Sequence, residues 1–164
     1  MIYIQLIGIL AFCVMLLSFY KKKTSTIIAY QIISNLAYTI HYLLLGALSG
    51  SFISIVGVFR NILLLRIKKH KNVLAAIIIF IYLLITIIFY ENYSSILPMI
   101  ANSQYLISML RGTKKSMLIG GLISSSLWFT YGVFVSSYAS MLTESILLIS
   151  NSIQLIKLNK NISK

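Results

Sequence analysis

The chain has 164 residues, of which 59% are hydrophobic, and its 14 Lys and Arg against 2 acidic residues give a formal net charge of +12. This apolar fraction, with one proline, excludes an ordinary soluble domain and indicates a polytopic membrane protein. The positive charge does not indicate nucleic-acid binding, because it falls in short clusters between apolar segments and suits an anionic membrane surface. The single cysteine, Cys13, excludes an internal disulfide and a cysteine-based metal site.

Seven apolar segments follow one another along the chain, each near the roughly 20 residues that cross a bilayer as a helix. They cover residues 2–20, 24–45, 47–67, 73–90, 95–110, 116–136 and 139–158. Backbone groups in lipid must be satisfied within each segment, and no barrel-type alternation is present, so we expect helices. The first segment is followed, not preceded, by lysines, which is the reverse of a cleaved signal peptide, so we expect it to be retained.

Thirteen of the fourteen basic residues fall in four clusters, after the first, third, fifth and seventh segments. The clusters are Lys21, Lys22 and Lys23; Arg66, Lys68, Lys69 and Lys71; Arg111, Lys114 and Lys115; and Lys157, Lys160 and Lys164. The other three junctions contain no Lys or Arg. Because cytoplasmic loops retain these residues, the pattern predicts an odd number of spans, with the N-terminus outside and the C-terminus in the cytoplasm.

The chain also contains a weak internal repeat. A shift of 91 residues aligns 23–69 with 114–160, and 13 of the 47 aligned positions are identical. Both copies would cross the membrane in the same sense, because an odd helix lies between them. The repeat therefore predicts a first bundle of three helices at 1–72, a linker helix with an outer loop at 73–94, and a second bundle with a short cytoplasmic tail at 95–164.

Polar side chains recur along single faces of the predicted helices. The main ones are Gln31, Asn35, Tyr38 and His41; Arg60 and Asn61; Asn102 and Gln104; Trp128 and Tyr131; and Glu144, Asn151 and Gln154. Small and polar residues also hold membrane helices together, and this alternative explains most of the Ser, Thr and Gly. Five helices that each present an amide, an aromatic ring or a charge indicate instead a polar cavity.

A helix rise of ~1.5 Å per residue sorts these side chains into two layers. The predicted middle layer contains Asn35, Arg60, Asn61, Trp128 and Asn151, and the predicted outer layer contains His41 and Glu144. We therefore expect His41, rather than Arg60, to be the nearer partner of Glu144. Two readings stay open: Arg60 meets an anionic or hydroxyl-rich solute, with His41 and Glu144 as a gate or proton relay, or the three form one buried network that fixes packing.

No motif indicates catalysis. The sequence has no Asp, no metal-ligand cluster, no Gly-rich phosphate loop and no Ser-His-acid set at usable spacing. We expect a protein that is not an enzyme and that needs no cofactor or metal.

Several short stretches resemble the YgjV-type bacterial inner-membrane proteins, within the SWEET/PQ-loop (MtN3-like) superfamily of small transporters. These are Gln5-Leu6-Ile7-Gly8, His41-Tyr42, Leu45-Gly46, Arg60-Asn61, Trp128 with Tyr131, and Glu144 with Ser150-Asn151. The likeness runs along nearly the whole chain. It implies an all-α inner-membrane protein with seven transmembrane helices arranged as 3+1+3 parallel repeats.

In SWEET-type transporters, an Asn on the third helix of each repeat and nearby aromatic rings contact the sugar. Asn151 matches this pattern, Asn61 matches it one position away, and Trp128 would supply an aromatic wall. The Pro-Gln dipeptide is missing, and of the prolines that bend the helices in both repeats only Pro98 remains. Arg60, at the level of a sugar site, argues against simple sugar uniport.

The resemblance thus implies a candidate small-solute transporter that works by alternating access between two triple-helix bundles. Its expected partners are the lipid bilayer and a small polar or anionic solute. The alternative is a non-transporting membrane receptor or assembly factor with a polar pocket on the same scaffold.

Overall fold

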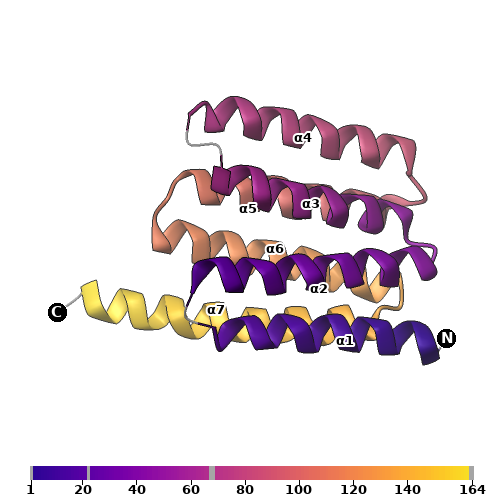
Figure 1. Cartoon of the computed structure of the whole chain (residues 1–164), viewed down its shortest axis with the longest axis horizontal. Helices are drawn as coiled ribbons and strands as arrows, with labels where there is room; N and C mark the ends of the chain where they lie inside the picture. The colour runs from indigo at the N-terminus through magenta and orange to yellow at the C-terminus, as the bar shows by residue number, and fades with distance from the viewer. Residues whose placement is uncertain (1, 22, 67–68, 163–164) are drawn as a thin grey trace.

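The computed structural model of the protein describes residues 2–21, 23–66 and 69–162. Within these ranges the chain forms seven α-helices, a short 3-10 turn and no strand (Figure 1). The helices are α1 (Ile2–Phe19), α2 (Thr24–Leu44), α3 (Leu48–Arg66), α4 (Lys71–Ile88), α5 (Ile96–Leu110), α6 (Lys114–Phe134) and α7 (Tyr138–Ile162). The all-helical prediction is confirmed, and the helix ends differ from the predicted ones by a few residues.

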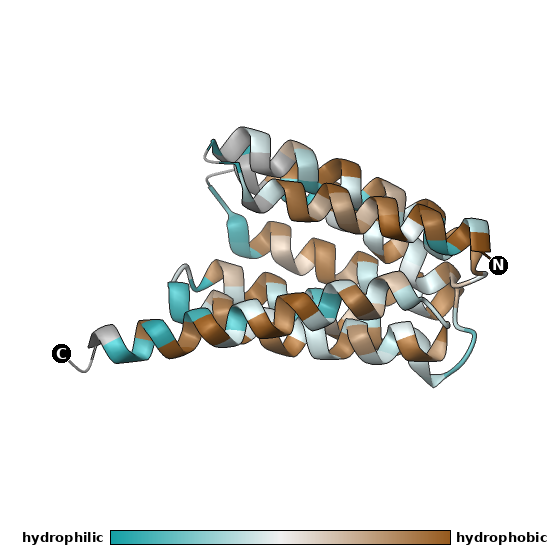
Figure 2. Cartoon of the chain, turned by 90° about the horizontal axis from the view of Figure 1, so that it is seen from below, coloured by the Kyte–Doolittle hydropathy of each residue, from teal (hydrophilic) through white to brown (hydrophobic). Residues whose placement is uncertain are grey.

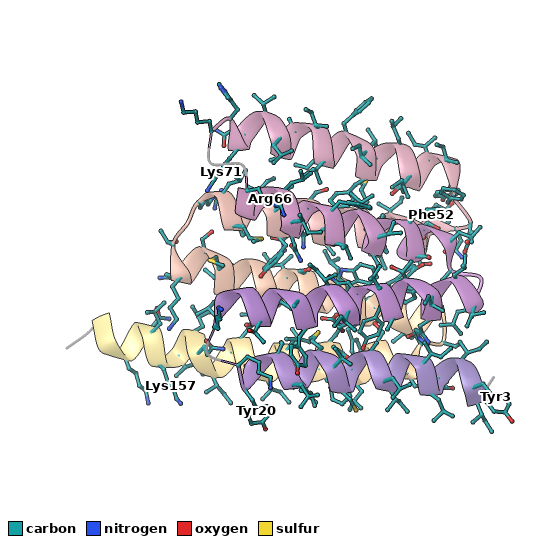
Figure 3. All side chains as sticks on the ribbon, in the orientation of Figure 1. Tyr3, Tyr20, Phe52, Arg66, Lys71 and Lys157 are labelled. Carbon is teal, nitrogen blue, oxygen red and sulfur yellow. The ribbon has the colours of Figure 1, made fainter. Side chains whose placement is uncertain are left out.

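The basic residues gather at one end of the molecule. In Figure 3, Arg66, Lys71 and Lys157 lie at this end, and Tyr3 lies at the opposite end. We call the first the basic end and the second the turn end, because it contains the α2–α3 and α6–α7 turns. Three members of the basic clusters, Lys22, Lys68 and Lys164, lie outside the described ranges.

The α2–α3 and α6–α7 turns share one backbone geometry. Gly46 (φ 77°) and Ser136 (φ 54°) both adopt the left-handed conformation, which a glycine accepts without strain. The next residue of each turn, Ala47 or Ser137, donates its amide to the carbonyl of the residue five positions earlier. Corresponding residues of the two turns are therefore 90 positions apart, not the predicted 91. The identities behind the predicted register are mostly Ile, Leu and Ser, which recur too often to fix a register to one residue.

The helices pack in two sequential groups. α2 contacts α1 and α3, α6 contacts α5 and α7, and the two groups meet where α1 packs on α7 and α3 on α5. α4 packs mainly on α3 and α5, at the edge of the assembly (Figure 1). One buried cluster, which includes Tyr42 and Tyr131, lies near the turn end, and a second, which includes Ile53 and Leu106, lies under α4.

Many large apolar side chains are exposed along the helices, and hydrophobic residues make up much of each helix (Figure 2). By length and composition, three of the described helices can cross a membrane, at Lys71–Ile88, Lys114–Phe134 and Tyr138–Lys160. Ile2–Ser18 and Leu48–Leu63 are shorter apolar stretches. α2 is not among these stretches, and α5 is 15 residues long.

Candidate functional site

A polar cavity of about 110 Å³ lies between the first three and the last three helices. Its wall includes Asn35 of α2, Arg60 of α3, Asn102 of α5, Trp128 of α6 and Glu144 of α7. The volume exceeds the roughly 10–15 Å³ that one ordered water requires. It is below the roughly 300–1,000 Å³ of pockets for drug-sized ligands. The cavity is therefore suited to a few waters or one small polar solute.

Arg60 is almost completely buried, with 6% of its surface exposed, and amide oxygens hold its guanidinium in place. Its Nη1 donates to Asn102 Oδ1 at 3.1 Å. Its Nε and Nη2 both donate to Asn61 Oδ1, at 3.2 and 3.1 Å. The guanidinium also lies 5.8 Å from the centre of the Tyr105 ring, within reach of a cation–π attraction. In the part of the chain that the structure describes, no carboxylate neutralises this charge.

Glu144 lies in the second turn of α7 and lines the same cavity as Arg60. Its carboxyl lies beside the Ser125 hydroxyl of α6. Among the described residues it forms no ion pair, either with Arg60 or with another basic side chain. The cavity therefore contains one basic and one acidic side chain, one from each half of the molecule, that do not pair with each other.

The rings of Tyr42 and Trp128 line the cavity on the side of the turn end, and Tyr131 packs against both. Tyr42 stacks on Trp128 with ring centres 5.5 Å apart, and Tyr131 contacts both rings at 5.7 and 5.6 Å. Such offset and edge contacts between rings add to the stability that burial alone provides. The Tyr42 hydroxyl donates to Ser140 Oγ at 2.7 Å and so joins α2 to α7.

The same region contains most of the hydrogen bonds between the two halves of the molecule. They join Gln5 to Ser136, Tyr38 to Thr143, His41 to Ser137, Tyr42 to Ser140, and Tyr131 to Ser49 and Gly50. We call this set the turn-end seal. On the other side of the cavity, the described residues show one such bond, between Arg60 and Asn102. The cavity is therefore closed more firmly toward the turn end than toward the basic end.

A sequence model of the bacterial inner membrane protein family Imp-YgjV matches residues 2–162. The chain belongs to this family. This result confirms the predicted family and the predicted bacterial inner membrane location. In the same comparisons, no curated protein and no solved structure matches the chain.

The Gln5-Leu6-Ile7-Gly8 stretch, on which the Imp-YgjV resemblance partly rests, has a structural role at the seal. Gln5 Nε2 donates to the Ser136 carbonyl at 2.8 Å. A Cβ atom at Gly8 would lie 2.5 Å from Ala139 Cβ and 2.9 Å from His41 Cε1. Glycine is therefore required for the close approach of α1 to α7 and to His41.

The structure brings together four of the seven predicted site residues of this Imp-YgjV protein, because Asn35, Arg60, Trp128 and Glu144 line one cavity. The predicted middle and outer layers thus meet in a single space. Asn61 supports Arg60 through its side-chain oxygen. Asn151 lies against α6, where a Cβ at Gly121 would be 2.7 Å from Asn151 Nδ2.

The predicted pairing of His41 with Glu144 is wrong. His41 Nδ1 donates to the Ile4 carbonyl at 2.8 Å, and Nε2 shares a hydrogen bond with Ser137 Oγ at 2.7 Å. Both ring nitrogens are thus used, Nδ1 toward α1 and Nε2 in the turn-end seal. The closed network of His41, Glu144 and Arg60 is therefore not formed.

Sequence reasoning did not assign Asn102 and Tyr105, the partners that α5 supplies to Arg60. Asn102 was visible as a polar residue of the fifth segment, but nothing in the sequence linked it to Arg60. The signal that could have found both is their spacing, since residues three apart lie on one helix face.

Proposed function

We propose that the protein transports a small polar solute across the inner membrane by alternating access between α1–α3 and α5–α7. The observation that carries this proposal is the polar cavity between the two groups of helices, with Arg60 on one and Glu144 on the other. Ionisable groups at membrane depth are costly and commonly mark a substrate or ion pathway. A cavity between two bundles changes its access when one bundle rocks against the other.

The proposal includes a SWEET-like arrangement of two parallel three-helix repeats joined by α4. The matching geometry of the turns at Gly46 and Ser136 supports it. In this register of 90, Asn61 corresponds to Asn151. Such a repeat provides similar bundles on the two sides of one central site, as alternating access requires.

We further propose that the N-terminus faces the outside and that the basic end faces the cytoplasm, as the positive-inside rule predicts. The turn-end seal would then close the cavity toward the outside. C-terminal fusions to green fluorescent protein and to alkaline phosphatase test this orientation. We expect the green fluorescent protein fusion to be fluorescent and the alkaline phosphatase fusion to be inactive. A dark first fusion and an active second one would refute the proposed orientation.

The test of transport begins with a thermal-shift screen of the purified protein against sugars, organic anions and amino acids. A solute that binds in the cavity raises the Tm of the wild type by mass action. We expect Arg60→Gln to abolish this stabilisation and Arg66→Gln, at the exposed basic end, to retain it. The same solute should accumulate in proteoliposomes that contain the wild type or Arg66→Gln.

Two results contradict transport. If Arg60→Gln keeps both the stabilisation and the uptake, the cavity is not the site. If the solute binds in an Arg60-dependent manner but no uptake follows, the alternative of a receptor or assembly factor with a polar pocket is favoured.

A further inference from the structure

We infer that the solute is a small zwitterion of the amino acid class, with its carboxylate on Arg60 and its ammonium group near Glu144. This inference rests on the proposed function, because it names the solute of the same cavity. It depends on three features: two separated opposite charges, the spacing between them, and the size of the space that they share.

The first feature is that each charge lacks an opposite charge. Neutral amide oxygens of Asn61 and Asn102 orient the Arg60 guanidinium. The Tyr82 hydroxyl of α4 also lies beside the guanidinium, and among the described residues no carboxylate pairs with it. Glu144 has the Ser125 hydroxyl beside it and, over the same residues, no cation. The charged form of a buried ionisable group is unfavourable without a partner, so a ligand with the opposite charge stabilises the charged form of each group.

The second feature is the spacing along the helices. In the register of the two turns, Glu144 corresponds to Ser54, which precedes Arg60 by six residues and also lines the cavity. The two residues therefore start from levels about 9 Å apart along the helices. An α-amino acid with a charge-assisted hydrogen bond of about 2.8 Å at each end can extend between two such levels.

The third feature is the size of the space. A cavity of about 110 Å³, closed by the rings of Tyr42 and Trp128, leaves room for a short side chain only. A simple anion would pair with Arg60 and leave Glu144 without a partner, and a simple cation would do the reverse. A zwitterion satisfies both groups and brings no net charge into the membrane.

A matched series of probes separates the three kinds of solute. L-alanine is the zwitterion, propionate carries only the carboxylate, and L-alaninamide carries only the ammonium group. Isothermal titration of the purified wild type should give binding of L-alanine and at least about 30-fold weaker binding of the other two, the usual result when one member of a buried charge pair is removed. Glycine and L-serine, each with its own pair of analogues, should follow the same order.

Two variants that each remove one ionisable group should bind a ligand that the wild type binds only weakly. A misfolded variant would lose binding and could not give this result. Glu144→Gln should bind propionate at least as tightly as L-alanine. Arg60→Gln should bind L-alaninamide in preference to L-alanine. Arg66→Gln should keep the wild-type order. If the wild type binds propionate or L-alaninamide as tightly as L-alanine, or if it binds no member of any series, the inference is overturned.

The same samples distinguish this inference from the proposed function. If the order of affinities holds but L-alanine does not enter proteoliposomes, the zwitterion site stands and transport is refuted. If the protein instead takes up a solute of another class in an Arg60-dependent manner, transport stands and the zwitterion assignment is refuted.

Discussion

The Tyr131 hydroxyl connects the two halves of the protein through the first turn of α3. It accepts a hydrogen bond from the Gly50 amide at 3.1 Å and shares another with Ser49 Oγ at 3.2 Å. The first amides of a helix have no acceptor within that helix, so a partner from outside must supply one. For the Gly50 amide this partner comes from α6, on the other side of the interface.

Tyr131→Phe tests the strength of this connection. The variant keeps the ring contacts with Tyr42 and Trp128 but leaves the buried Gly50 amide without its acceptor. A buried donor without a partner costs roughly 1–3 kcal/mol. For a chain of this size each kcal/mol lowers Tm by about 2–4 °C. We therefore expect a Tm at least about 2 °C lower than that of the wild type, by differential scanning fluorimetry in detergent.

Tyr138→Phe is the matched control, because Tyr138 begins α7 at the same end and is 66% exposed. Its Tm should equal that of the wild type. If Tyr131→Phe also unfolds at the wild-type temperature, the Gly50 amide has another acceptor, and Tyr131 does not join the two halves through it.

Two further variants test the close contacts at the turn end. Gly8→Ala should lower Tm, because the added Cβ would overlap Ala139 and His41. Gly57→Ala is the control: a Cβ there has no neighbouring atom within 4 Å, so this variant should keep or raise Tm. Equal shifts of Tm in both variants would contradict the close approach of α1 to α7. Glu91→Ala should destabilise the protein by no more than about 0.5–2 kcal/mol, the range for a lost helix cap, because the Glu91 carboxylate accepts from the Leu48 amide at 3.0 Å and that amide also donates to the Gly46 carbonyl. An unchanged denaturation midpoint would show that this cap contributes nothing.

The helices were predictable because apolar runs near the length of a bilayer leave the backbone few alternatives. The spacing between the two turns was not predictable, because it depends on which residue of each turn adopts a positive φ. Gly46 was recognisable as such a residue, but Ser136 adopts the same conformation without being a glycine. A comparison of side chains along the helices therefore gave an offset of 91, whereas the two turns are 90 residues apart.

The residues of the cavity were partly predictable for a similar reason. Polar stripes showed that Asn35, Arg60, Trp128 and Glu144 face inward. They did not show which neighbouring helix each side chain meets, because that depends on the rotation of every helix about its axis. His41 therefore lies at the depth expected for a partner of Glu144, yet it contacts the backbone of α1 and the start of α7.

The position of α4 has a consequence for how the cavity could be assembled. This helix lies at the edge of the molecule, and the hydrogen bonds that join the two halves come from other helices. The hydrogen bonds between the halves therefore do not depend on α4, although its buried face packs on both α3 and α5. A pair of independent three-helix chains would meet through the same hydrogen bonds, so a dimer of half-length proteins could build the same cavity.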